Sequence, residues 1–192
     1  MSAATFFSIG HSTRGLDAFL EILHGAQIAH LADVRAFPSS RRFPQFDGSA
    51  LARSLAAAGI GYTHFRALGG RRDRQPGIDP QRNGHWRSAG FHNYADYALG
   101  GDFGEAFAQL RALGNRGACA VMCAEADWRQ CHRQIVCDHL LHHGHPVIHL
   151  LDARRREPAT LNPAARSDAN GQLVYPANVA PAGPVTGDLF GG

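Results

Sequence analysis

The densest group of reactive side chains lies between residues 123 and 133. Cys123 and Glu125 are followed by Cys131 and His132, and Arg133 comes next. A thiolate acts as a nucleophile or a metal ligand, a histidine transfers protons near neutral pH, and a carboxylate can orient that histidine. A cation beside a cysteine lowers its pKa and increases its share of thiolate. The combination predicts a cysteine-based catalytic centre.

The four cysteines do not share one interpretation. Cys119 and Cys137 fall inside a predicted strand and a predicted helix, so we expect them to be small core residues. Together with Cys123 and Cys131 they form no Cys-x-x-Cys pair, and therefore no zinc-ribbon pattern. We predict no cofactor, and a metal held by Cys123, Cys131 and His132 is kept as an alternative.

A second group of polar residues follows the first two predicted strands. His11 and Ser12 come after the first strand, and Ser39 follows the second. Arg35 is expected to bind an anion, because a planar guanidinium matches two oxygens of a phosphate or carboxylate. Asp33 lies in a buried strand and needs a partner, so Arg35 is alternatively that partner. His11 is also an alternative metal ligand beside the two cysteines.

These residues receive specific roles in the catalytic interpretation. Cys131 or Cys123 is the nucleophile. His11 or His132 is the general acid or base, and Glu125 orients it. The predicted substrate-binding set consists of cationic, hydroxyl, carboxylate and phenol side chains: Arg35, Arg133, Ser12, Asp33, Ser39 and Tyr62.

The elements that must position these residues alternate along the chain. Strands are predicted over residues 5–10, 28–34, 60–65, 118–123 and 146–151. Helices are predicted over residues 16–26, 47–58, 93–113 (with a break at Gly100-Gly101) and 128–143. Apolar strands separated by helices indicate a parallel sheet covered on both faces. We therefore predict an α/β fold, a single-domain three-layer sandwich with a mostly parallel five-stranded sheet.

Ligands of such sheets bind beyond the carboxyl ends of the strands, and the reactive residues follow those ends. Asp127 and Gln130 resemble a capping box and predict a helix that begins at about Trp128. Cys131 would then lie one turn inside this helix, near the positive end of its dipole.

Two segments have no apolar periodicity. Residues 68–90 contain Gly-Gly and the arginine cluster 71–74, which predicts a long loop that is either solvated or a lid over an anion. Pro and Gly are frequent from residue 157 onward. We therefore predict an α/β domain over 1–156 and a C-terminal appendage over 157–192, with residues 173–175 as a candidate edge strand.

Composition excludes some chemistry. The 192 residues include 19 Arg and no Lys, so Schiff-base and P-loop lysines are absent. The net charge of +3 is too small to indicate a nucleic-acid partner without other support. No apolar run approaches the roughly 20 residues of a membrane-spanning helix. The N-terminal residues also lack the basic segment followed by a hydrophobic segment that is typical of a signal peptide. We expect a cytoplasmic protein with no membrane partner.

Several short motifs look like those of the DUF488 family, whose members are uncharacterised bacterial and archaeal proteins. These motifs are Ile9-Gly10-His11-Ser12, Asp33-Val34-Arg35 with Pro38-Ser39-Ser40, Gly61-Tyr62, Leu68-Gly69-Gly70, and Cys123-Ala124-Glu125 with Cys131-His132-Arg133. They occur in order from about Phe6 to His149. The resemblance implies a compact α/β domain with a site lined by Arg, Cys and His, and it implies no established reaction.

The expected function is that of an enzyme, a Cys-dependent hydrolase or transferase, acting on an anionic substrate that carries a phosphate or a nucleotide. One alternative is a nucleic-acid- or nucleotide-binding module without catalysis, in which arginines contact phosphates and aromatic residues stack on bases. The other alternative is a redox or metal sensor based on the cysteines. The oligomeric state is left open.

Overall fold

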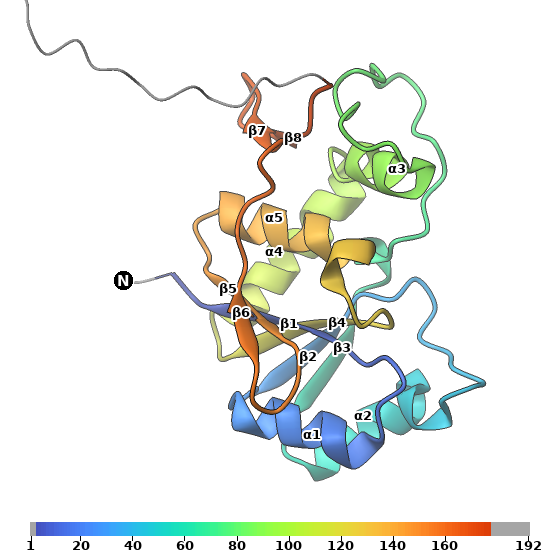
Figure 1. Ribbon diagram of the computed structural model, residues 1–192, viewed down its shortest axis with the longest axis vertical. Helices are drawn as coiled ribbons and strands as arrows, with labels where there is room; N and C mark the ends of the chain where they lie inside the picture. Colours follow the sequence, from blue (N-terminus) through green and yellow to red (C-terminus); the bar gives the residue numbers. More distant parts are fainter. Residues whose placement is uncertain (1–2, 178–192) are drawn as a thin grey trace, which may run out of the picture.

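Figure 1 shows a computed structural model that describes residues 3–177. Its main sheet has the strand order β3-β2-β4-β1-β5-β6, and only β6 is antiparallel to its neighbour. The strands are β1 (Phe6–Gly10), β2 (His30–Asp33), β3 (Gly61–His64), β4 (Cys119–Cys123), β5 (Val147–Leu150) and β6 (Arg156–Pro158). The predicted mostly parallel α/β sheet is confirmed. The additional strand, β6, is short and largely exposed, so it has no apolar run that would indicate it.

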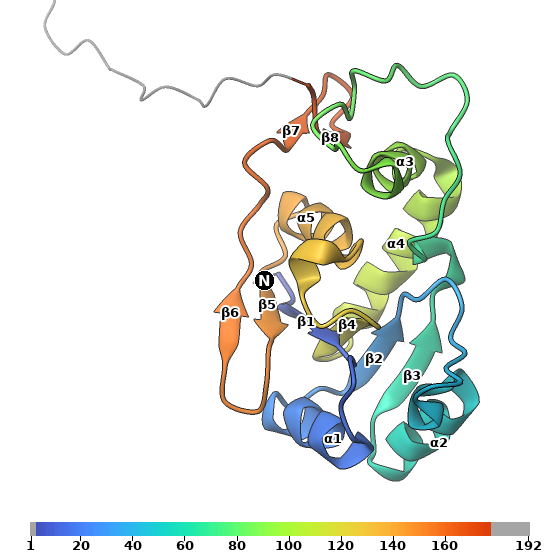
Figure 2. The same ribbon diagram turned by 45° about the vertical axis from the view of Figure 1, so that its right-hand side comes forward.

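Helices cover both faces of this sheet, as Figures 1 and 2 show. On one face lie α1 (Leu16–Gly25) and α2 (Gly48–Ala57). On the other lie α4 (Gly101–Gly114) and α5 (Arg133–His142), with α3 (Ala89–Tyr97) packed beside them. The arrangement is the predicted three-layer sandwich. Within residues 3–177, no helix combines the length and the apolar character needed to cross a membrane.

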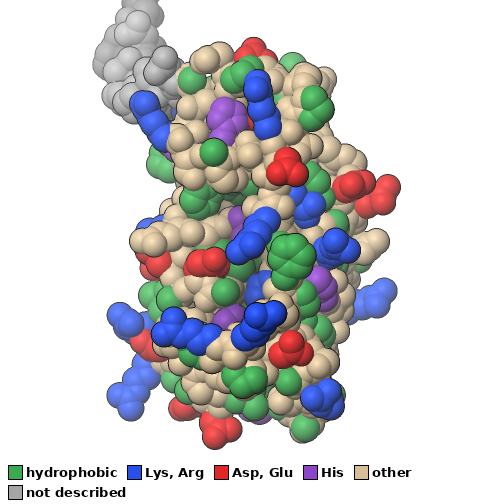
Figure 3. Space-filling model, turned by 90° about the vertical axis from the view of Figure 1, so that its right-hand side faces the viewer, with side chains coloured by type: hydrophobic (Ala, Val, Ile, Leu, Met, Phe, Trp, Pro, Cys, Tyr) green, Lys and Arg blue, Asp and Glu red, His purple; other side chains and the backbone are tan. Residues whose placement is uncertain are grey.

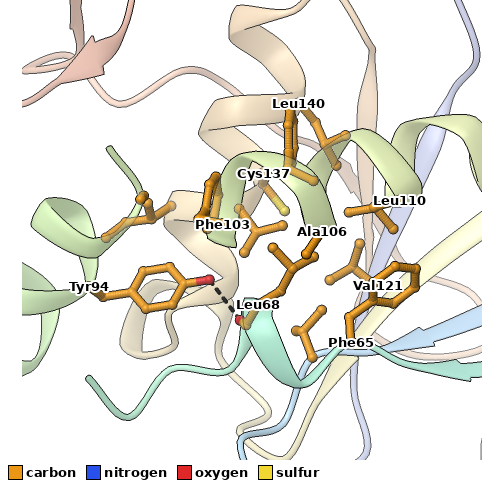
Figure 4. Close-up of a cluster of buried hydrophobic side chains, with 14 of the residues drawn as sticks. Phe65, Leu68, Tyr94, Phe103, Ala106, Leu110, Val121, Cys137 and Leu140 are labelled. Carbon is orange, nitrogen blue, oxygen red and sulfur yellow. Dashed lines mark hydrogen bonds between the residues drawn. The ribbon is translucent and has the colours of Figure 1, made fainter. Parts of the chain in front are cut away.

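Each face has its own hydrophobic core. Along β4, Val121 packs into the cluster under α4 and α5, whereas the next residue, Met122, packs into the cluster under α1 and α2. Because both faces are buried, β4 is apolar at every position. Figure 4 shows the α4 side of the core, where the Tyr94 hydroxyl donates a hydrogen bond to the Leu68 carbonyl at 2.7 Å.

Short 3-10 helices and loops connect these elements at the carboxyl edge of the sheet. They are η1 (Pro44–Phe46), η2 (Arg66–Leu68) and η3 (Trp128–Gln130). The predicted helix over 93–113 is divided into α3 and α4, as the Gly100-Gly101 break suggested. Asp47 caps α2 through its side chain, which accepts a hydrogen bond from Ser49 N.

The predicted helix over 128–143 is not continuous. Cys131 has an extended backbone (φ −128°, ψ 143°), so η3 ends before it and α5 begins only at Arg133. The expectation that Cys131 lies one turn inside a helix is therefore wrong. The physical reason is that the chain turns at Cys131, and this turn brings its sulfur toward the end of β4.

Residues 157–177 run along the α5 side of the molecule. Here β7 (Arg166–Ser167) and β8 (Leu173–Val174) form a separate two-stranded sheet, so the candidate edge strand at 173–175 does not join the main sheet. Tyr175 is buried, and its hydroxyl donates to Asp138 Oδ2 on α5 at 2.9 Å. The remainder of the predicted appendage, from residue 178, lies outside the described residues.

Candidate active site

A cleft of about 860 Å³ opens at the carboxyl ends of β1 and β4. These strands are neighbours, and Gly10 is paired with Cys123 at their ends. After β1 the chain passes to α1 on one face, and after β4 it passes to α5 on the other, which is the topological position where α/β sheets bind ligands. A Cβ at Gly10 would overlap the carbonyl of Glu125, so only glycine allows this close approach.

Cys123, Cys131 and His132 come together in the wall of this cleft. His132 Nδ1 lies 3.7 Å from Cys131 Sγ and 4.0 Å from Cys123 Sγ. One ligand atom from each residue lies within 4.8 Å of the other two, so the three side chains could hold a metal ion. We call these three residues the Cys-Cys-His centre.

The orientation of His132 is fixed by a hydrogen bond to the backbone. Its Nε2 lies 2.9 Å from the carbonyl oxygen of Val34, which can only accept a hydrogen bond. The proton of the neutral ring is therefore on Nε2, and Nδ1 presents its lone pair to the two sulfurs.

Packing holds the same ring in place. Tyr94 contacts it edge-on, with the ring centroids 5.0 Å apart. On another side, a Cβ at Gly70 would overlap the imidazole atoms, so a glycine is required there. The Leu68-Gly69-Gly70 motif thus supports the centre, although sequence reasoning assigned it no role.

The turn at Cys131 is anchored on both sides. Trp128 stacks on the buried ring of His149, with centroids 4.2 Å apart. The backbone N–H of Arg133 donates to Cys131 Sγ at 3.5 Å. Burial favours the neutral thiol of Cys131, but the contacts with Cys123, His132 and Arg133 outweigh it and hold its pKa well below the usual value.

Cys123 behaves in the opposite way. Its thiol donates to Glu125 Oε2 at 3.0 Å. The contact with Cys131, burial, and the negative charges of Cys131 and Glu125 raise the pKa of Cys123. Of the pair, Cys131 is thus the residue whose surroundings favour the thiolate, and Cys123 the one whose surroundings favour the thiol.

On the other face of the sheet, Asp33 and Arg35 form a buried ion pair. Arg35 Nε donates to Asp33 Oδ1 at 2.9 Å and Nη2 donates to Oδ2 at 2.6 Å. The hydroxyl of Tyr62 donates to the same carboxylate at 2.8 Å. Arg35 Nη1 donates to the carbonyl of Phe46 at 2.8 Å. Most guanidinium donors are thus already bonded within the protein, as expected of a structural partner for Asp33.

His11 completes this cluster and is neutral. Its Nδ1 lies 2.9 Å from the carbonyl oxygen of Ser12, so Nδ1 carries the proton, and Nε2 faces Arg35 Nη1 at 3.5 Å. Burial, aided by the charge of Arg35, lowers the pKa of His11. Ser12 itself has a positive φ of 50°, a left-handed conformation that is uncommon for residues other than glycine.

Arg133 is directed away from the cleft. Its side chain is only 1% exposed, and it donates to Ser8 Oγ at 2.9 Å and to the carbonyl of Glu125 at 2.6 Å. It therefore fixes the backbone beside Cys123 and is not available to hold a substrate anion.

The structure brings most of the predicted site residues to the cleft. Those that line it are His11, Ser12, Arg35, Ser39, Cys123, Glu125, Cys131 and His132. Those that do not are Asp33, Tyr62 and Arg133. Sequence reasoning missed Phe37 and Phe43, which also line the cleft, because aromatic residues in a loop are not distinguishable from core residues by pattern.

The face shown in Figure 3 is the side of the molecule on which the loops after β2 and β3 lie. Arginine side chains surround an exposed hydrophobic side chain near its middle. Of these loops, residues 69–88 contain no helix or strand, and Arg71 from this segment lines the cleft.

The sequence profile described as "Domain of unknown function DUF488" matches residues 15–140, about two thirds of the chain. The chain belongs to this family. The DUF488 match includes the whole Cys-Cys-His centre, whereas His11 and Ser12 lie just before its start. No curated protein and no solved structure matches the chain significantly.

Proposed function

We propose that this DUF488 protein is an enzyme that acts on an anionic substrate, with the Cys-Cys-His centre as its reactive group. The observation that carries the proposal is the convergence of Cys123, Cys131 and His132 in the wall of one cleft, with their ligand atoms within 4.8 Å of one another. Two cysteine sulfurs and an oriented imidazole lone pair in one place serve nucleophilic, acid-base or metal chemistry.

The shape of the cleft favours a small-molecule substrate. Its volume of about 860 Å³ is within the range of pockets that enclose small ligands. Its wall offers hydroxyl groups from Ser12, Ser39 and Ser40 and apolar surface from Phe43 and Phe91. The lining thus combines many polar side chains with a few aromatic ones, which suits a small polar molecule.

Arg71 is the residue best suited to attract an anion. It is exposed and lines the cleft, and within residues 3–177 it forms no ion pair with a carboxylate. Arg35 also lines the cleft, but the carboxylate of Asp33 neutralises it. A guanidinium at the rim can hold a phosphate through paired hydrogen bonds.

Binding of anions is tested first by thermal unfolding with inorganic phosphate, AMP or adenosine. Phosphate and AMP should raise the Tm, adenosine should not, and Arg71→Gln should abolish the effect. Arg154→Gln, which removes an exposed arginine outside the cleft, should keep it. Equal shifts in Arg71→Gln and the wild type would exclude Arg71 as the anion-binding group.

Catalysis is tested by incubating the protein with a panel of nucleotides and phosphate esters and analysing the products. Turnover by the wild type should be lost in Cys131→Ser and retained in Cys137→Ser, because Cys137 is buried in the core away from the cleft. Turnover that survives Cys131→Ser would contradict the proposal. Anion binding at Arg71 without conversion of any compound would favour a binding module.

A nucleic-acid-binding function is a second candidate, favoured by one observation. Phe37 lines the cleft with 60% of its side chain exposed, and Arg41 and Arg42 are exposed a few residues along the same loop. An exposed aromatic ring beside arginines is the arrangement that stacks a base and contacts its phosphate. Affinity for a single-stranded oligonucleotide would then fall steeply with salt and in Phe37→Ala.

A further inference from the structure

The Cys-Cys-His centre has the donor atoms, spacing and orientation of a metal site with three protein ligands. We propose that Cys123, Cys131 and His132 bind one zinc ion, whose fourth coordination position opens into the cleft. The proposal that zinc binds does not depend on the proposed enzymatic function. The proposal that zinc takes part in a reaction does rest on that function.

The donor set is the first argument. Two thiolates and one imidazole form a soft ligand set that suits zinc, and Cys₂His is a known set for zinc sites that keep an open position. All three side chains come from the end of β4 and from the turn that leads directly into α5.

Distances are the second argument. In a tetrahedral site with Zn–S bonds of about 2.3 Å and Zn–N bonds of about 2.0–2.1 Å, nitrogen and sulfur lie about 3.6 Å apart. His132 Nδ1 is 3.7 Å from Cys131 Sγ and 4.0 Å from Cys123 Sγ. Movements of a few tenths of an ångström bring the nitrogen to coordination spacing from each sulfur, and the two sulfurs lie within 4.8 Å of each other.

The groups behind the ligands are the third argument. A metal-bound histidine usually donates its second N–H to a carbonyl or carboxylate, which fixes the tautomer. His132 has this bond to Val34, and it directs the Nδ1 lone pair at both sulfurs. The N–H of Arg133 donates to Cys131 Sγ, as expected for a group that stabilises thiolate charge.

The fourth argument is the balance of charge between the ligands and a divalent cation. Cys123 and Cys131 are 5% and 2% exposed. Two thiolates and one divalent cation sum to zero, so zinc would leave this buried centre without net charge. Zinc would displace the proton of Cys123, since a coordinating thiol is deprotonated.

Glu125 is placed to use the open position. It lines the cleft and contacts Cys123 Sγ at 3.0 Å, but it is not one of the three clustered ligands. Zinc lowers the pKa of a bound water to about 7. Glu125 would take the proton of that water, and the hydroxide would form a bond to the electrophilic atom of the substrate. The bond to the leaving group breaks, and Glu125 returns the proton to that group, so that the net change is hydrolysis.

Cobalt(II) tests this on the full chain. Titration of the metal-free wild type with Co²⁺ should saturate at one equivalent, with thiolate-to-cobalt charge transfer and the intense visible bands of a four-coordinate ion. Zn²⁺ should remove the spectrum by displacement. Cys123→Ser, Cys131→Ser and His132→Ala should each weaken Co²⁺ binding at least 100-fold, whereas Cys137→Ser should bind as the wild type does. Circular dichroism of each variant confirms that it is folded.

The open position is tested by adding azide to the cobalt form. A shifted visible spectrum supports an exchangeable fourth ligand, and an unchanged spectrum contradicts it. Absence of thiolate-to-cobalt charge transfer in the wild type would overturn the site as a whole. That failure would leave the Arg71 test untouched, because Arg71 is not a ligand, so the two proposals fail separately.

Discussion

Gly70 lies against the imidazole ring of His132 so closely that a Cβ at this position would overlap Nδ1, Cγ and Cε1. Nδ1 is the atom that faces both cysteine sulfurs. Gly70→Ala is therefore expected to displace the ring and to weaken Co²⁺ binding about 10–100-fold, the usual effect of losing a group that orients a metal ligand. An absorption titration of wild type and variant measures this change.

Gly104 offers the matched control. It lies within α4, and a Cβ there would meet nothing within 4 Å. Gly104→Ala should leave Co²⁺ affinity unchanged and raise the free energy of unfolding by about 0.5–1 kcal/mol, since alanine favours a helix interior. If Gly70→Ala bound Co²⁺ with the affinity and spectrum of the wild type, the close contact would not be what holds His132.

The buried pair of Asp33 and Arg35 should contribute strongly to stability. Asp33→Asn leaves the guanidinium of Arg35, which is 5% exposed, without a counter-charge. Removing one partner of such a pair lowers the free energy of unfolding by about 3–5 kcal/mol. Urea denaturation of both proteins gives this difference.

An exposed ion pair provides the comparison. Glu157 pairs with Arg129 at 2.7 Å, and the side chains of Arg129 and Glu157 are 53% and 37% exposed. Glu157→Gln should change the free energy of unfolding by less than about 1 kcal/mol. If Asp33→Asn lowered the free energy of unfolding by no more than Glu157→Gln does, water would have to reach Arg35.

Two buried histidines should make the protein less stable in acid. Burial, with nearby positive charges, lowers the pKa of His139 to about 3 and the pKa of His149 to about 4. An unfolded histidine has a pKa of about 6.5, so below that pH the unfolded chain binds protons that the folded chain excludes. The contribution of these neutral histidines to the free energy of unfolding is therefore complete above about pH 6.5. It is lost as the pH falls toward the pKa values of the folded state, by up to about 1.4 kcal/mol per pH unit for each group.

Urea unfolding at a series of pH values from about 7.5 to about 4.5 measures this slope. His139 packs against Phe103 and Phe107, and its Nε2 has no hydrogen-bond partner among the described residues. His139→Leu should therefore fold and show a shallower loss of stability in acid. An unchanged slope in this variant would show that His139 is protonated in the folded state.

Removal of zinc should lower the thermal stability of the wild-type protein. A ligand that binds only the folded chain stabilises it by about 2.7 kcal/mol at a free concentration of 100 Kd. The Tm of the wild type should thus fall when a chelator is added and rise again when Zn²⁺ is added. Cys123→Ser should show neither response, and a response in that variant equal to the wild type would place the bound zinc elsewhere.

The sheet and the position of the cleft were predictable because they depend on local patterns. Apolar runs such as residues 118–123 define buried strands, and residues that follow parallel strands share one edge. Cys123, which ends such a run, could therefore be assigned to the edge that also holds His11.

Side-chain direction was harder to predict from the sequence. Arg133 directly follows Cys131 and His132 in the sequence, yet its side chain is buried against Ser8. The extended backbone at Cys131 interrupts a stretch with good helical periodicity, and the interruption depends on packing such as the stacking of Trp128 on His149. Contacts between residues far apart in sequence, such as Gly70 with His132, leave no periodic pattern.

The zinc-edge X-ray absorption spectrum of the zinc-loaded full chain tests the central claim most directly. The structure predicts two sulfur neighbours at about 2.3 Å and two nitrogen or oxygen neighbours at about 2.0–2.1 Å, one from His132 and one exchangeable. Cys131→Ser should remove one sulfur neighbour. A zinc ion with no sulfur neighbour, or with four protein ligands and none exchangeable, would contradict the assignment of the Cys-Cys-His centre as an open metal site in the cleft.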